Sequence, residues 1–235
     1  MWLLALFASA VGGGIYGFFW WKKRQEAKKR YHIDLDYGQL PKPGPRSAFV
    51  GLIAETTKKT YFDLDQMQTH TLVAGSTGSG KSVASQGIVE EALMKGTAVM
   101  VFDPTVQWTG FLSRCQDKKF MSLYPKFGMK KSDARAFPGN IHQVLDSREI
   151  IEFDKYIKPG EINVFVVNKL DTRDYEIFVS NTIREVFHNN MPESRQLKLV
   201  LVFDEFHRLL PKYGGTGQVL IQIERAAREF RKWGV

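Results

Sequence analysis

Unbroken runs of apolar residues mark the regular elements of the chain. The clearest run, Leu199-Val200-Leu201-Val202-Phe203, contains no polar side chain. Runs of this length and continuity are typical of strands that are buried on both faces of a parallel sheet. Similar runs occur elsewhere, and Gly234-Val235 resembles the beginning of another. We therefore predict strands at Thr71–Ala74, Thr97–Phe102, Glu161–Val167 and Leu199–Phe203.

A second pattern places helices between these strands. From Val83 to Lys95 the apolar residues recur at helical spacing, directly after the first predicted strand. Residues 47–69 are long enough for little more than a β-hairpin. Strands that alternate with helices favour an α/β domain with a mainly parallel sheet covered on both faces.

The N-terminal segment has a different pattern. Trp2 to Trp21 contains no charged side chain, and at about 1.5 Å per residue it is long enough to cross a bilayer core. Basic residues at 22–24 and 28–30 follow an aromatic cluster, so the positive-inside rule places the rest of the chain in the cytoplasm. A cleaved signal peptide would carry its positive charge before the apolar run, and a buried soluble helix would not need this basic flank.

These patterns divide the chain into three parts. We predict a transmembrane helix at 1–21 and a cytoplasmic domain at 47–235. Between them, 22–46 is a basic juxtamembrane segment that ends in the proline-rich linker Pro41-Lys42-Pro43-Gly44-Pro45. The expected location is the cell membrane, with a single crossing.

Charge indicates the class of partner, and the cysteine content excludes one class of fold. A net charge of +8 and an isoelectric point near 9.5 indicate an anionic partner, either nucleic acid or an anionic membrane surface. The single cysteine, Cys115, excludes an internal disulfide framework.

The first predicted strand leads into a phosphate-binding loop with the pattern G-x-x-x-x-G-K-S. Its glycines let successive backbone N–H groups point at phosphate oxygens. In this pattern Lys81 reaches the β- and γ-phosphates and the Ser82 hydroxyl binds Mg²⁺. The predicted nucleotide-binding residues are Gly75, Ser76, Thr77, Gly78, Ser79, Gly80, Lys81, Ser82 and Val83.

Acidic residues at strand ends complete the predicted chemistry. Asp204 follows the run at 199–203 and can hold Mg²⁺ through water, while Glu205 can orient and deprotonate a water for attack on the γ-phosphate. Asp103 ends another strand and is a further candidate for the metal's water shell. We expect ATP and Mg²⁺ as cofactors, with Lys81 and Glu205 as catalytic residues.

Asn168-Lys169-Leu170-Asp171 matches the N-K-x-D pattern that reads guanine in GTPases. A GTPase would also need a D-x-x-G sensor, whereas Asp103 is followed by Pro104, Thr105 and Val106. We therefore interpret the match as chance.

Four segments together resemble the HerA/FtsK superfamily of ring-forming DNA motors, which includes archaeal HerA-type ATPases and the coupling and secretion ATPases of conjugation. They are HTLVAGSTGSGKS at 70–82, VFDP at 101–104, LVLVFDEFHRLLP at 199–211 and ERAAREFRKWGV at 224–235. The resemblance covers the chain from about Phe49 onward. It implies a RecA-like P-loop domain, ATP hydrolysis and a homohexamer with ATP between its subunits.

The resemblance also implies an arginine supplied by the neighbouring subunit. Arg228 is the first candidate and Arg231 the second, and we expect both on one helix with Arg225, with all three near one face. The sequence departs from its relatives at Gln107-Trp108, where many have an acidic residue. It also stops where relatives begin the strand that leads to a polar sensor residue, so we expect a fragment.

Three functions remain open at this stage. The first is an ATP-driven, membrane-anchored DNA translocase acting in conjugation, DNA import or chromosome transfer. The second is an ATPase that energises a secretion or pilus-like machine, with other membrane or channel proteins as partners. The third is an ATP-binding scaffold that does not hydrolyse. The insert at 107–146 is basic between Asp117 and Arg135, which suits either a solvated surface or a phosphate backbone.

Overall fold

The computed structural model describes residues 14–24, 35–127, 129–189, 191–213 and 216–235. The chain divides into two units, Met1–Leu40 with Leu52–Lys58, and Pro41–Gly51 with Lys59–Val235. In the first unit, residues 14–24 are helical and expose Trp20 and Trp21. No helix within the described ranges is both long and apolar enough to cross a membrane. The predicted membrane helix lies partly outside those ranges, at residues 1–13, and therefore stays a prediction.

The second unit is built on a sheet of four parallel strands in the order β4-β5-β3-β6. In this register Met100 of β3 lies opposite Asn163 of β5 and Leu201 of β6. The strands are β3 (Ala98–Asp103), β4 (Gly139–Gln143), β5 (Ile162–Val166) and β6 (Leu199–Phe203). The predicted strands at 97–102, 161–167 and 199–203 are thereby confirmed.

Side-chain alternation along these strands produces two cores, one on each face of the sheet. Along β3, Met100 and Phe102 pack into one core, and Val99 and Val101 pack into the other. All six residues of β3 are buried, which explains its continuous apolar pattern.

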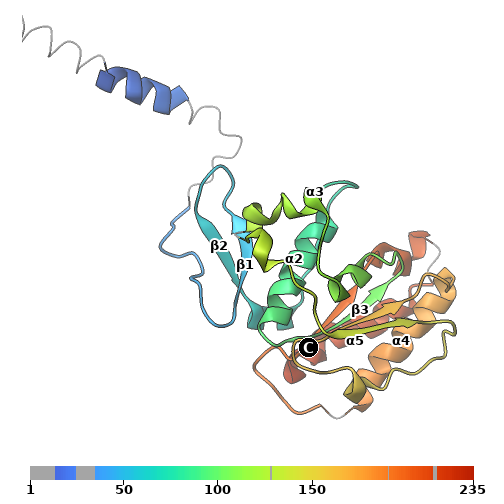
Figure 1. Ribbon diagram of the computed structural model, residues 1–235. Coiled ribbons are helices and arrows are strands. Elements are labelled where there is room, and N and C mark those ends of the chain that lie inside the picture. The colour runs from blue at the N-terminus through green and yellow to red at the C-terminus, as the bar shows by residue number, and fades with distance from the viewer. Residues whose placement is uncertain (1–13, 25–34, 128, 190, 214–215) are drawn as a thin grey trace, which may run out of the picture. The chain divides into compact units, whose positions relative to one another are not determined.

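Helices cover both faces of this sheet (Figure 1). Buried residues of α2 (Lys81–Met94) join one core, and those of α4 (Thr172–His188) and α5 (Gln218–Glu229) join the other. The α/β fold with a parallel sheet is therefore as expected, and α2 matches the helix predicted over 83–95. The short helix α3 (Lys118–Met121) lies in the insert.

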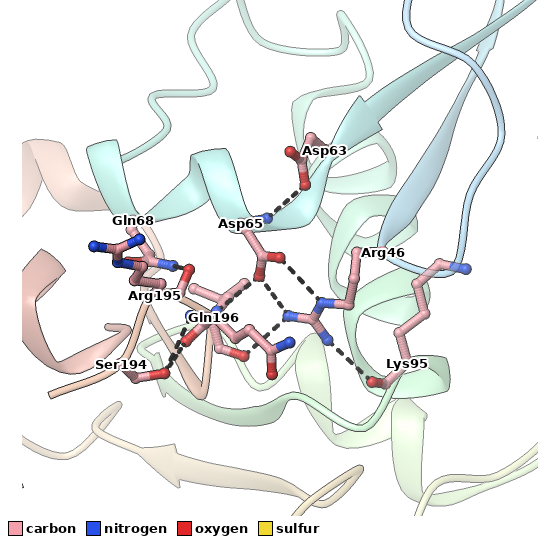
Figure 2. A network of polar contacts seen from close by, with 9 residues as sticks. Arg46, Asp63, Asp65, Gln68, Lys95, Ser194, Arg195 and Gln196 are labelled. Atoms are coloured by element: carbon pink, nitrogen blue, oxygen red, sulfur yellow. Dashed lines mark hydrogen bonds and ion pairs between the residues drawn. The ribbon is translucent and has the colours of Figure 1, made fainter. Parts of the chain in front are cut away.

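Strands β1 (Ser47–Leu52) and β2 (Lys59–Asp63) pair as the expected hairpin, which a 3₁₀ helix (Leu64–Thr69) follows. The Arg46 guanidinium just before β1 donates to Asp65 Oδ1 at 2.7 Å, to the Leu197 carbonyl at 3.1 Å and to the Lys95 carbonyl at 3.3 Å (Figure 2). Burial raises the pKa of Asp65, but the bonds from Arg46 and from the Leu197 N–H outweigh it and lower that pKa. This network joins the segment before β1 to the end of α2 and to the approach to β6.

Two predictions about strands were wrong. Thr71–Ala74 forms no strand and is exposed, with Leu72 at 81%. An isolated strand leaves its backbone groups unpaired, and no strand of the described sheet lies beside this segment. Gly234-Val235 also forms no strand, although the Gly234 carbonyl accepts from the Lys198 N–H at 2.7 Å.

The predicted insert contains a strand that the apolar pattern did not reveal. Strand β4 reads Gly-Asn-Ile-His-Gln and pairs with β5 at one edge of the sheet. Asn140 on β4 donates through Nδ2 to Asn163 Oδ1 at 2.8 Å, which satisfies a buried amide of β5. An edge strand is partly solvated, so it does not need a continuous apolar sequence.

Candidate active site

The candidate site lies where the carboxyl ends of β3 and β6 meet. The register pairs Phe102 with Phe203, so the next residues, Asp103 and Asp204, leave the sheet side by side. Helix α2 ends just before β3 begins and runs back along the sheet for about 21 Å at 1.5 Å per residue. Its first turn, and the loop before it, therefore lie toward the same end of the sheet as the two aspartates. Parallel α/β sheets bind ligands at this end, beyond the carboxyl ends of their strands.

The loop from Gly75 to Gly80 has the backbone of a phosphate cradle. Gly78 and Gly80 have φ of +77° and +89°, in the left-handed region that favours glycine. A Cβ on Gly75 would come within 2.6 Å of Ser79 Oγ, so a side chain there would displace its neighbour. Residues 71–80 are exposed, so a ligand can approach this loop, within which the Ser79 N–H donates to the Ser76 carbonyl at 3.2 Å.

Helix α2 adds the charged part of the cradle. It begins at Lys81, and its first-turn N–H groups lack partners within the helix, as at any helix N-terminus. Lys81 Nζ donates to the Ser76 carbonyl at 3.1 Å, so the ammonium folds over its own loop. Ser82 and Val83 are half-buried in the first turn. The donors fit the polyphosphate of ATP, and the Ser82 hydroxyl fits Mg²⁺, whose remaining ligands are commonly carboxylates, phosphates and waters.

Asp103 is fully buried, and both of its oxygens accept hydrogen bonds from the loop that follows. Oδ1 accepts from the Thr105 N–H at 2.8 Å and from the Thr105 hydroxyl at 2.9 Å. Oδ2 accepts from the Trp108 N–H at 2.8 Å. Its predicted role at the metal stays a prediction. The structure does show that Asp103 fixes residues 104–108 through these hydrogen bonds.

Asp204 is held by side chains from that same loop. Its Oδ2 accepts from Trp108 Nε1 at 3.1 Å, and the Thr105 hydroxyl, whose hydrogen is donated to Asp103, lies 3.4 Å from the same oxygen. Burial raises the pKa of Asp204, and the Asp103 and Glu205 charges add to the rise. The bonds from Trp108 and from the Glu205 N–H oppose this rise, because both stabilise the ionised carboxylate.

Glu205 follows Asp204 in an unusual backbone conformation. Its φ of +49° and ψ of 42° lie in the left-handed region, which costs energy for any residue with a side chain. Its side chain is about 39% exposed, and Oε2 pairs with His207 Nδ1 at 2.9 Å. The carboxylate is therefore accessible to water and held by a neighbouring imidazole.

Helix α4 contributes a buried hydroxyl near the acids and a buried carboxylate that bonds the start of α5. Tyr175 is 2% exposed, and its hydroxyl has no hydrogen-bond partner within the described structure. Burial raises the pKa of this hydroxyl, and the Asp204 charge raises it further. Glu176 accepts from the N–H groups of Thr216 at 2.7 Å and Gly217 at 3.1 Å, which fixes the start of α5.

The structure separates the three candidate arginines. Arg225 stacks over the Phe187 ring at 4.2 Å and pairs with Glu229, so it contacts its own subunit. The Arg228 side chain is 76% exposed and pairs with Glu224 one turn earlier.

Arg231 lies beyond the end of α5, in the 3₁₀ helix Phe230–Trp233, where it lines an open pocket with Asp65 and Glu193. The sequence analysis placed all three arginines on one continuous helix. That placement was wrong for Arg231, because α5 ends at Glu229.

Sequence reasoning missed the residues that hold the acids. Trp108 was noted only as a departure from relatives, yet its indole contacts Asp204. The available signal was its position a few residues past a core strand, where parallel sheets place ligand-facing loops.

The matched N-K-x-D segment has a structural explanation. Asp171 accepts from the Asp174 N–H at 2.8 Å and caps α4, and Asn168 accepts from Gln143 Nε2 at 3.2 Å.

Comparison with known proteins gives one family match and one match to a curated protein. Residues 48–109 match the family model described as "Helicase HerA, central domain". The match spans the hairpin, the phosphate-binding loop, α2, β3 and the loop after it.

The chain is also similar to the DNA translocase FtsK of Streptococcus pneumoniae (strain ATCC BAA-255 / R6). The two are 30% identical over 160 residues, which is 63% of this chain and 17% of that protein. The chain thus spans less than a fifth of the length of this curated relative. Together the two matches support a similarity of this chain to the HerA/FtsK superfamily of P-loop ATPases.

Proposed function

We propose that the protein is an ATP-hydrolysing DNA translocase anchored in the cell membrane, with its ATPase domain in the cytoplasm. The ATPase part is supported by the phosphate-binding loop at the start of α2 together with two acids, Asp103 and Asp204, at the carboxyl ends of β3 and β6. The similarity to a protein named a DNA translocase supports the choice of DNA. The net charge of +8 suits the same polyanion.

In the proposed mechanism each residue has a separate task. The loop N–H groups and Lys81 bind the phosphates of ATP, while Ser82 and Asp204 hold Mg²⁺. The metal, when bound, neutralises charge that develops on the phosphates. Glu205 orients a water molecule and accepts its proton through a carboxylate oxygen, while an arginine from a neighbouring subunit stabilises the γ-phosphate. The assembly is a homohexamer.

The membrane part rests on residues outside the active site. The uncharged run at 2–21 and the basic residues after it support a single crossing with the ATPase domain inside. Such a protein moves DNA at a membrane, as in conjugation, DNA import or chromosome transfer.

ATP turnover by the full chain, measured with and without DNA, tests the proposal. We expect turnover to rise several-fold when linear DNA is added, and this rise to weaken as salt increases, because phosphate contacts release counterions. Glu205→Gln is the control for contaminating ATPases. Turnover that ignores DNA would favour the energiser of a secretion machine, and nucleotide binding with no turnover would favour a scaffold.

A further inference from the structure

The loop between β3 and Trp108 forms a fixed bridge between the two strand-end aspartates. Asp103 anchors it by accepting from the N–H groups of Thr105 and Trp108, both at 2.8 Å. Val106, at the middle, has a φ of +63°, which is a strained conformation for a β-branched residue. Such strain persists only where the surrounding contacts impose it. The contacts with Asp103 therefore fix the conformation of this loop.

The conformation of this loop places the Trp108 indole within hydrogen-bonding distance of Asp204. Trp108 is 1% exposed, its ring stacks on Phe111 at 5.6 Å, and Nε1 donates to Asp204 Oδ2 at 3.1 Å. An indole N–H can only donate, so it favours one orientation of a charged carboxylate. The indole engages Oδ2, and the Glu205 N–H also bonds this carboxylate, so the carboxylate is held in a fixed orientation in which it could bind the water shell of a metal.

We propose that Trp108 is a positioning residue for the Mg²⁺ site, since its indole N–H, carried on the Asp103-anchored loop, fixes the carboxylate of Asp204. The inference rests on the proposed ATPase function of the site. Asp103 thereby acts on the metal indirectly, through the loop. The usual role of a buried tryptophan is to fill a core, and the hydrogen bond to Asp204 is what distinguishes the two roles.

Mg²⁺-dependent nucleotide binding by the full chain tests this role without relying on turnover. The probe is a fluorescent, non-hydrolysable ATP analogue titrated at a series of Mg²⁺ concentrations. Trp108→Phe keeps an aromatic ring beside Phe111 but removes the donor. We expect this variant to need about tenfold more Mg²⁺ for half-maximal tightening, since hydrogen bonds to charged groups are among the stronger ones. Affinity for the analogue without Mg²⁺ should not change.

Two further variants separate positioning from packing. Phe111→Leu disturbs the stacked ring and lowers stability but should leave the Mg²⁺ requirement unchanged. In an Asp204→Ala background, Trp108→Phe should have no further effect on the Mg²⁺ requirement, because the partner of the indole is already gone. An unchanged Mg²⁺ requirement in folded Trp108→Phe would overturn the proposal, as would an effect that persists without Asp204.

A spectroscopic measurement covers the case in which Trp108→Phe does not fold. The wild-type chain, labelled with ¹⁵N-tryptophan, should show one buried indole N–H resonance that moves with Mg²⁺ and analogue together and not with the analogue alone. That movement should be absent in Asp204→Ala, and its presence there would contradict the proposal. Wild-type protein that binds no nucleotide at all would instead refute the proposed function.

Discussion

Lys81 and Glu205 lie in different parts of the candidate site. Substituting each of them should therefore affect ATP binding and ATP turnover differently. Lys81 lies over the phosphate-binding loop, where its ammonium already contacts a loop carbonyl. Glu205 lies beyond β6, exposed enough to contact water. In the proposed mechanism the first residue neutralises the charge of ATP in every state, and the second acts during hydrolysis.

We predict that Lys81→Ala loses both ATP binding and turnover, because the phosphate charge is left uncompensated. Glu205→Gln should keep ATP bound while turnover falls by about 10²-fold or more, as the loss of a general base implies. Binding of a fluorescent nucleotide and steady-state phosphate release measure the two effects, with Lys119→Ala on the exposed insert as a charge-matched control. Near-normal turnover in Glu205→Gln would remove Glu205 from the mechanism.

Sequence spacing suggested some candidate site residues and could not suggest others. Lys81, Ser82 and Asp204 became candidates because the proposed chemistry fixes their spacing from a loop or a strand end. The contact of Trp108 with Asp204 joins residues 96 positions apart, and it depends on the register between β3 and β6. No local pattern encodes such a contact, so it emerged only from the structure.

Elements were predictable where burial imposes a continuous pattern. The strands β3, β5 and β6 are enclosed between two cores, so their apolar runs revealed them. Strand β4 is a polar edge strand, whose identity depends on pairing with β5 rather than on its own sequence. Thr71–Ala74 has the composition of a strand but no strand beside it in the described sheet, so its pattern was misleading.

Helix α4 allows a test at this scale, because Asp171 belongs both to its cap and to the N-K-x-D match. We predict that Asp171→Ala lowers the free energy of unfolding by about 1 kcal/mol, the usual cost of losing an N-cap side chain. ATP binding should stay unchanged, because the carboxylate bonds the Asp174 N–H rather than a base. Urea denaturation and competition between ATP and GTP measure the two quantities.

Lys169→Ala is the matched control for this experiment. In a GTPase both N-K-x-D positions contribute to nucleotide recognition, whereas here Lys169 is exposed and lies outside the cap. We expect Lys169→Ala to leave stability and nucleotide choice nearly unchanged. A preference for GTP that either substitution abolishes would restore the GTPase interpretation.

At the scale of the whole molecule, membrane attachment should be separable from nucleotide binding. We predict that deleting residues 1–30 releases the protein from membranes, since the only long uncharged run of the sequence is removed. The deletion ends well before Arg46, which anchors the start of the α/β domain to Asp65, so the proposed ATP binding should persist. Membrane sedimentation and nucleotide binding of the shortened chain measure both outcomes.

A high-salt wash distinguishes insertion from surface adsorption. The full chain should stay with the membrane at high salt, because an apolar helix does not depend on screened charge. A shortened chain that still sediments with membranes after the wash would reveal a second attachment site.

Arg228 allows the proposed assembly and the proposed hydrolysis to be tested together. Its guanidinium is largely exposed and, among the residues that the structure describes, pairs with Glu224 of its own helix. It could therefore reach a neighbouring subunit at the cost of one surface ion pair, worth at most about 1 kcal/mol. Supplied in trans, such a group stabilises γ-phosphate charge in the transition state by about 10³-fold or more. We predict that Arg228→Ala leaves ATP affinity roughly intact and sharply lowers turnover.

Mixing subunits shows whether Arg228 acts across an interface. In a ring that combines Arg228→Ala with Glu205→Gln subunits, the two defects fall in the same site at some interfaces and leave others intact, so some turnover should return. Arg228→Lys serves as the matched variant, because it keeps the charge but loses the planar fork of donors, and it should recover only part of the rate. If mixed rings form and stay inactive, Arg228 does not act in trans. Arg231, which lines the pocket with Asp65 and Glu193, then becomes the residue to test.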